Sequence, residues 1–130
     1  MPIQRTVLVI DDDSNVREVL QMALEDCGYR VLCAPDGEVG ISRALKEAPD
    51  LVIVDMMMPV VSGFVVLERL KQQHQFAVPI IMLTGNESDQ QRLYAEFLGV
   101  DVYLNKPVRR THLLEAVSRF CPLPIEAIVP

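Results

Sequence analysis

The chain has 130 residues, of which 50% are hydrophobic and 23% are charged, which predicts one globular domain and excludes a largely disordered protein. Its net charge of −6 at pH 7 argues against direct binding of nucleic acid. No apolar run is long enough to span a bilayer and residues 1–6 lack the apolar core of a signal peptide, so we expect a cytoplasmic protein with no membrane partner.

Strand and helix patterns alternate along the chain. Short continuous apolar runs are typical of strands buried on both faces, and apolar residues at helical spacing are typical of amphipathic helices. In chain order the patterns predict a strand at 7–10, a helix at 16–27, a strand at 29–34, a helix at 36–48, a strand at 51–54, a helix at 63–73, a strand at 80–83, a helix at 88–98, a strand at 102–104 and a helix at 113–121. Five strands that alternate with five helices predict an α/β fold with one parallel sheet and helices on both faces.

The apolar stripes of the first two helices indicate which side chains face the sheet. They comprise Val16, Val19, Leu20, Ala23, Leu24 and Cys27 in the first helix, and Gly40, Ile41, Ala44, Leu45 and Ala48 in the second. Residues 1–121 are expected to form the domain. Residues 122–130 contain three prolines and no clear periodicity, and we expect a terminal tail or the start of a linker there.

Polar side chains follow four of the five predicted strands. They are Asp11, Asp12 and Asp13 after the first strand, Asp55 after the third, Thr84 after the fourth, and Asn105 and Lys106 after the fifth. The carboxyl ends of parallel strands share one edge of the sheet, and ligands of such sheets bind beyond that edge. We therefore expect these groups to converge in one pocket.

The residue types in this pocket point to a metal ion and a phosphoryl group. Crowded carboxylates repel one another, and a divalent cation removes that cost. Oxygen ligands without histidine or cysteine favour a hard ion, so the sequence predicts Mg²⁺, with Mn²⁺ as the alternative. Lys106 adds an ammonium suited to a phosphoryl oxygen, and Thr84 adds a hydroxyl. Asp13 is expected to cap the following helix instead.

Five stretches of the chain resemble the receiver domain of two-component response regulators. In that family's order they are VIDDD at 9–13, DG at 36–37, DMMMPVVSG at 55–63, LTG at 83–85 and GVDVYLNKP at 99–107. The resemblance covers about residues 5–121. It implies a flavodoxin-like fold, a single doubly wound sheet in strand order 2-1-3-4-5 with five helices, and a phosphorylation-activated signalling switch rather than a turnover enzyme.

The resemblance also implies roles for the pocket residues. Asp55 would be the phosphoacceptor, whose carboxylate attacks the phosphorus of a phosphohistidine on a sensor histidine kinase or phosphotransfer protein. Asp11, Asp12, Asp55 and the backbone carbonyl of Met57 would bind Mg²⁺. The ion and Lys106 would then neutralise charge on the phosphoryl oxygens.

A conformational switch is part of the same resemblance. Thr84 would donate a hydrogen bond to the phosphoryl group, and Tyr103 would be the aromatic that packs inward when Thr84 moves. The altered face would comprise the helix at 88–98, the strand at 102–104 and the helix at 113–121, where a partner or a second copy docks. Its expected exposed residues are Gln91, Tyr94, Arg109, Arg110 and Arg119. The resemblance also implies a cis Lys106–Pro107 bond, which the small cis penalty of X-Pro bonds allows.

Two details of this chain lead to separate expectations. Arg109 stands where the family has a helix-capping side chain, and arginine cannot accept a hydrogen bond, so we expect Thr111 to cap a later helix start. By the same resemblance, Met57 and Asn86 would flank the path of the water that hydrolyses the acyl phosphate. Neither can act as a general base at neutral pH, which predicts slow autodephosphorylation.

Two other classes of function remain open at this point. The spacing of Asp11 and Asp13 superficially fits phosphohydrolases of the haloacid dehalogenase type, although Asn15 stands where that family has Thr or Val and the chain is short for it. A phosphorylation-independent interaction module is the other class. Such degenerate receivers usually lack an acid or the lysine, whereas this chain has the full set.

Overall fold

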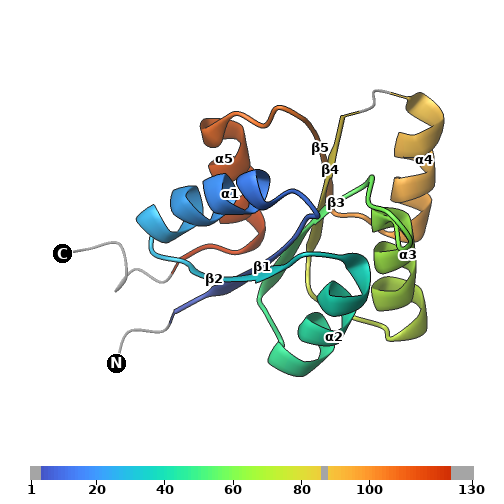
Figure 1. The fold of residues 1–130 in the computed structure, drawn as a ribbon, viewed down its shortest axis with the longest axis horizontal. Coiled ribbons are helices and arrows are strands. Elements are labelled where there is room, and N and C mark those ends of the chain that lie inside the picture. Colours follow the sequence, from blue (N-terminus) through green and yellow to red (C-terminus); the bar gives the residue numbers. More distant parts are fainter. Residues whose placement is uncertain (1–3, 86–87, 124–130) are drawn as a thin grey trace.

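The structure, a computed structural model, describes residues 4–85 and 88–123, which form a five-stranded parallel sheet with helices on both faces (Figure 1). The elements are β1 (Thr6–Ile10), α1 (Ser14–Asp26), β2 (Arg30–Ala34), α2 (Gly37–Glu47), β3 (Leu51–Asp55), α3 (Gly63–Glu68), a π-helix (Arg69–Gln73), β4 (Ile80–Thr84), α4 (Asp89–Leu98), β5 (Val102–Asn105) and α5 (Arg110–Phe120). The strand order β2-β1-β3-β4-β5 confirms the predicted α/β, flavodoxin-like fold. Among the described residues, no helix is both long and apolar enough to cross a bilayer.

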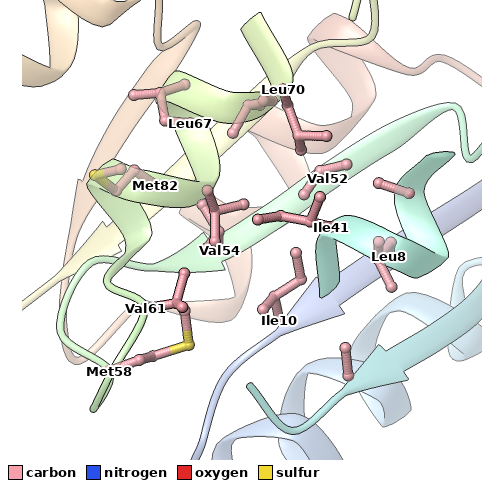
Figure 2. Packing of buried hydrophobic residues seen from close by; sticks show 14 of the residues in the cluster. Leu8, Ile10, Ile41, Val52, Val54, Met58, Val61, Leu67, Leu70 and Met82 are labelled. Atoms are coloured by element: carbon pink, nitrogen blue, oxygen red, sulfur yellow. The ribbon is translucent and has the colours of Figure 1, made fainter. Parts of the chain in front are cut away.

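The three central strands are buried on both faces of the sheet. Every residue of β1, β3 and β4 is buried, and successive side chains enter two separate apolar layers because a strand alternates its side chains. Val7 and Val9 pack in the layer with α1 and α5, whereas Leu8 and Ile10 pack in the layer with α2, α3 and α4. Figure 2 shows the second layer, in which side chains from α2 and α3 meet those of β1 and β3.

The buried stripes of α1 and α2 are narrower than the sequence predicts. Val19 is 65% exposed and Leu45 is 45% exposed, while Ala48 is an exposed, left-handed C-cap just outside α2 with φ of 48°. The prediction that these three side chains face the sheet is wrong. Periodicity locates an apolar stripe on a helix, but the neighbouring elements decide how much of its width they cover.

The helical pattern at 63–73 contains two kinds of helix. The α-helix ends at Glu68, and Arg69–Gln73 is a π-helix. From it, the Lys71 ammonium donates to the carbonyl oxygen of Val78 at 3.0 Å and pairs with Asp101 at 3.1 Å. This contact ties the end of the helical segment to the loop before β5, at the edge of the sheet opposite Asp55.

The start of α5 differs from the expectation that Thr111 caps a late helix. The helix begins at Arg110 and Thr111 lies within its first turn, so that expectation is wrong. Arg109 is the N-cap and provides no side-chain hydrogen bond, but its carbonyl accepts from the amide of Leu113 at 3.0 Å. Backbone hydrogen bonding alone therefore starts this helix.

The loop from β3 to α3 returns tightly onto the strand that it follows. The Gly63 amide donates to the carbonyl of Met56 at 2.8 Å, and a Cβ at Gly63 would lie 2.7 Å from the Met56 Cα, so only glycine fits there. Within this loop Val60 has φ of 67° and a fully exposed side chain. A β-branched residue in the left-handed region is strained, and no burial offsets the strain here.

Replacing Val60 with asparagine should therefore stabilise the protein. Asparagine adopts left-handed φ more readily than valine, so Val60→Asn is expected to raise the free energy of unfolding by about 1 kcal/mol, measured by urea denaturation. The control is Val19→Asn, at an exposed valine inside α1, which should give no such gain. Equal stability of Val60→Asn and the parent chain would refute the strain argument.

Candidate functional site

The carboxyl ends of four strands bring the predicted polar residues to one edge of the sheet. Asp11 follows β1, Asp55 ends β3, Thr84 ends β4 and Lys106 follows β5. Carboxylate oxygens of Asp11, Asp12 and Asp55 all lie within 4.8 Å of one another. Asp12 is exposed, whereas Asp11, Asp55 and Thr84 are buried. The base of the pocket is therefore buried, and one carboxylate, that of Asp12, faces solvent at its opening.

Lys106 supplies the positive charge in this pocket. Its ammonium lies 3.2 Å from a carboxylate oxygen of Asp11 and 3.1 Å from one of Asp55. Its amide donates to the carbonyl of Thr84 at 2.6 Å, which continues the pairing of β5 with β4. The Lys106–Pro107 peptide bond that follows is cis. A single ammonium thus serves two buried carboxylates from two different strands.

The titration behaviour of Asp55 and Lys106 reflects this shared charge. Burial raises the pKa of the Asp55 carboxyl, and the negative charge of Asp11 adds to that rise, against the opposing hydrogen bond and charge of Lys106. For Lys106, burial by itself would lower the pKa, but the hydrogen bond to Asp55 and the charges of both carboxylates outweigh it and raise the pKa. The cluster consequently lacks positive charge.

The donor set of the pocket fits a hard divalent cation. Asp11, Asp12 and Asp55 form a group that could hold a metal ion, and all three offer carboxylate oxygens, the ligands that Mg²⁺ and Mn²⁺ prefer. Burial and the negative charge of Asp11 both disfavour the ionised form of the Asp55 carboxyl and raise its pKa. A cation would relieve both the repulsion and the shortage of positive charge.

Asp13 stands apart from this cluster, as predicted. Its carboxylate accepts from the amide of Asn15 at 2.9 Å and caps α1. An aspartate directly beside the pocket in sequence is thus occupied with local backbone bonding. The Asp-x-Asp signature of phosphohydrolases would require the Asp13 carboxylate in the site, but it caps α1 instead.

Three further predicted residues surround the acidic cluster. Met57 donates its amide to the Asp55 carboxylate at 3.4 Å and exposes 64% of its surface at the rim. Thr84 is completely buried at the end of β4. Tyr103 is partly buried, and its hydroxyl lies 3.5 Å from the Met56 sulfur. Asn86, the other residue expected beside the water path, lies outside the described residues.

The helix α4 of the predicted output face exposes more apolar surface than the sequence analysis predicted. Gln91, expected to be exposed, is half-buried because it lies on the inner side of α4, and Arg110 is engaged with Asp26 of α1 at 3.4 Å. The sequence reading missed Leu93 and Phe97, which are 64% and 80% exposed. Their spacing of four residues within α4 was the available signal, since it places both on one helix face.

Comparison with known proteins identifies the same kind of domain. The family model for the response regulator receiver domain matches residues 7–118. The chemotaxis protein CheY4 of Vibrio cholerae is similar in structure, with a TM-score of 0.85, 32% sequence identity, and coverage of 91% of this chain and 99% of that chain. The structure described as the BeF3-activated DrrB receiver domain has a TM-score of 0.81 and 29% identity, and covers 91% of this chain and 97% of that one.

A longer curated relative is also similar in sequence. The alkaline phosphatase synthesis transcriptional regulatory protein PhoP of Bacillus subtilis (strain 168) is 37% identical over 105 residues, which are 81% of this chain and 43% of the relative. This chain thus spans less than half the length of that protein.

The raised pKa of Asp55 predicts how stability depends on pH without a bound cation. As pH rises through the ordinary range of an aspartate, the unfolded chain loses this proton first, so the parent protein loses stability until the pH exceeds the raised folded-state pKa. Asp55→Asn removes that loss. In the presence of chelator, its free energy of unfolding should exceed the parent's at pH 7, and the difference should shrink as the pH falls below the ordinary pKa.

Chemical denaturation from pH 3.5 to 7.5 measures this difference, with Asp13→Asn as the control at an exposed carboxylate. A difference between Asp55→Asn and the parent that is the same at every pH would contradict the assigned cause.

Proposed function

Because this chain belongs to the response regulator receiver domain family, we propose that Asp55 is its phosphorylation site and that a sensor histidine kinase or phosphotransfer protein is the phosphoryl donor. The chain is a phosphorylation-regulated signalling switch rather than a turnover enzyme. The observation that carries the assignment is the position of the Asp55 carboxylate, which is buried, 3.1 Å from the Lys106 ammonium and grouped with two further carboxylates.

Phosphoryl transfer at this position is a single displacement at phosphorus. A carboxylate oxygen of Asp55 forms the new bond to phosphorus as the phosphorus–nitrogen bond of the donor phosphohistidine breaks. The electron pair of that bond remains on the imidazole nitrogen, which takes up a proton. The Lys106 ammonium, already in contact with Asp55, is placed to pair with the phosphoryl oxygens as they arrive.

Asp11, Asp12 and Asp55, with the backbone carbonyl of Met57, are the proposed ligands of Mg²⁺, for which Mn²⁺ can substitute. When bound, the ion supplies positive charge that offsets repulsion between the carboxylates and the incoming phosphoryl group. The support for this assignment is the oxygen-only donor set and the 4.8 Å grouping of the three carboxylates.

The proposed switch runs from the pocket to the face formed by α4, β5 and α5. Thr84 donates a hydrogen bond to the phosphoryl group, and Tyr103 packs inward as Thr84 moves. Tyr103 is hydrogen-bonded through its hydroxyl to Met56, the residue after Asp55. The aromatic thus already contacts the loop that carries the phosphorylation site, which supports coupling between the two.

Output then occurs through a partner or a second copy that docks on the α4–β5–α5 face. Leu93 and Phe97 give α4, one element of this face, an exposed apolar patch, and Arg109 and Arg119 supply charge at α5. Residues 1–121 are the proposed receiver domain, and 122–130 a tail or linker start, of which 124–130 lie outside the described residues. We also propose a cytoplasmic location and no direct contact of this domain with nucleic acid.

Slow loss of the phosphoryl group is part of the same proposal. Met57 lies at the rim beside Asp55 and cannot accept a proton from an attacking water. Its substitution by asparagine, with the decay of the labelled protein followed by intact mass, reports whether this side chain limits hydrolysis.

Asp55 should be the one site that acetyl phosphate labels. With Mg²⁺, the intact chain is expected to gain a single phosphoryl group that hydroxylamine removes, as seen by mass spectrometry. Asp55→Asn should abolish labelling, and so should a chelator, because the carboxylates then repel the phosphate. Asp13→Asn, at the helix-capping aspartate, should label like the parent. Undiminished labelling of Asp55→Asn would refute the assignment of Asp55 as the phosphorylation site.

Beryllofluoride, a mimic of the phosphoryl group, should shift the chain from monomer to dimer in sedimentation velocity. Phe97→Gln, on the exposed face of α4, should abolish the shift because it removes apolar surface from the proposed interface. Met22→Gln alters another exposed apolar residue, on α1, and should leave the shift intact. An unchanged mass of the parent with beryllofluoride would count against the dimer.

A further inference from the structure

Arg17 of α1 reaches back to the strand end from which the acidic cluster begins. Its guanidinium Nη1 donates to the backbone carbonyl of Asp11 at 2.7 Å in a partly buried position. This carbonyl belongs to the peptide group that joins Asp11 to Asp12. Arg17 therefore forms a hydrogen bond with the peptide group between Asp11 and Asp12, two of the three residues whose carboxylates could hold a metal ion.

Asp11 is otherwise fixed by contacts on all its polar groups. Its amide donates to the carbonyl of Ala34 at 3.2 Å, one carboxylate oxygen accepts from the amide of Asp13 at 2.9 Å, and the other pairs with Lys106 at 3.2 Å. The position of Asp11 is thus determined by several independent bonds. Loss of any one of them leaves the others in place.

Asp12 lacks comparable support. In residues 4–85 and 88–123, no hydrogen bond or ion pair reaches the Asp12 carboxylate, which is exposed on the open side of the pocket. Its direction is set by the backbone on which it stands. Rotation of the Asp11–Asp12 peptide plane would swing this carboxylate, and the bond from Arg17 holds the carbonyl of that plane.

We propose that Arg17 is a positioning residue for the divalent cation, because it fixes the peptide plane from which Asp12 projects. This inference rests on the cation site of the proposed function and adds a residue that does not itself bind the ion. Residues that orient ligands in this way commonly change metal affinity by about tenfold or more when they are removed. Arg17 should act on affinity through geometry and not through its charge.

The sign of the effect separates geometry from charge. Arg17 carries a positive charge close to the acidic cluster, so Coulomb repulsion alone predicts that its removal strengthens cation binding. Loss of the positioning bond predicts the opposite. Methionine at position 17 keeps the apolar stem but removes both the charge and the donor, whereas lysine keeps the charge and one donor group.

The structure also offers a matched control at Arg43. Its guanidinium Nη1 donates to the backbone carbonyl of Cys33 at 2.7 Å, again from a helix to a strand, but in β2 and away from the carboxylates. Arg43→Met therefore removes the same kind of bond at the same length without touching the Asp11–Asp12 peptide.

The test measures Mn²⁺ binding to the 130-residue chain by electron paramagnetic resonance of the free ion. Arg17→Met should weaken binding about tenfold, Arg17→Lys should bind with intermediate affinity, and Arg43→Met should match the parent. Thermal unfolding in chelator reports whether each variant is folded. If Arg17→Met does not fold, Arg17→Lys carries the test and must bind more weakly than the parent. Parental or tighter binding by the folded Arg17→Met variant, or by Arg17→Lys in its place, overturns the inference.

A variant of the cation site itself separates the two levels of the argument. Asp12→Asn should lose most Mn²⁺ affinity if the acidic cluster is the cation site. Parental binding by Asp12→Asn, or no binding by the parent chain, would remove the proposed site. Weak binding by Asp12→Asn together with parental binding by Arg17→Met would leave the site standing and remove only the role of Arg17.

Discussion

The shortage of positive charge beside Asp11 and Asp55 is the constraint on which the rest of the site depends. Both carboxylates are buried, and together with Asp12 they place three acids against the single ammonium of Lys106. Burial and the Asp11 charge raise the pKa of Asp55, so its ionised form exists at a cost. A divalent cation and a phosphoryl group can enter such a pocket together, because the positive charge of the cation offsets the negative charge of the phosphoryl oxygens. The same imbalance disfavours a phosphoryl group that enters the pocket without a cation.

The apolar core holds these charges in place. Side chains of the central strands fill two layers, so a shift of one residue in any strand would move a whole apolar set to the wrong face. The register of β4 and β5 aligns Thr84 with Asn105 and so delivers Lys106 to the edge where β1 and β3 end. After Asp55, the loop packs its Gly63 backbone directly against the backbone of Asp55 and Met56, at a distance that excludes any side chain at position 63. The strain at Val60 is confined to this loop, where it lies next to the chemistry instead of in the core.

Two hydrogen bonds connect the backbone and loops around the pocket to other elements of the fold. Toward β5, Met56 contacts the hydroxyl of Tyr103. Toward α1, the carbonyl of Asp11 meets the guanidinium of Arg17. The first contact links the loop after Asp55, the proposed phosphorylation site, to β5, a strand of the proposed output face. The second connects Asp11, a proposed cation ligand, to α1, which lies with α5 on the other face of the sheet (Figure 1).

The order of the elements and the edge of the sheet at which the acids gather follow from local sequence patterns. Unbroken apolar runs and acids that directly follow them are local features, and the rules of parallel sheets turn them into Asp11, Asp55, Thr84 and Lys106 at one rim. The tertiary structure was needed for every feature that depends on contacts between elements. It determined that Val19 and Leu45 stay exposed, that a π-helix follows α3, and that backbone bonding starts α5 without a capping side chain. It also brought Arg17 to the Asp11 carbonyl. Periodicity records which side of a helix is apolar, but the reach of a long side chain and the width of a contact are set by packing against elements distant in the sequence, and no local pattern encodes them.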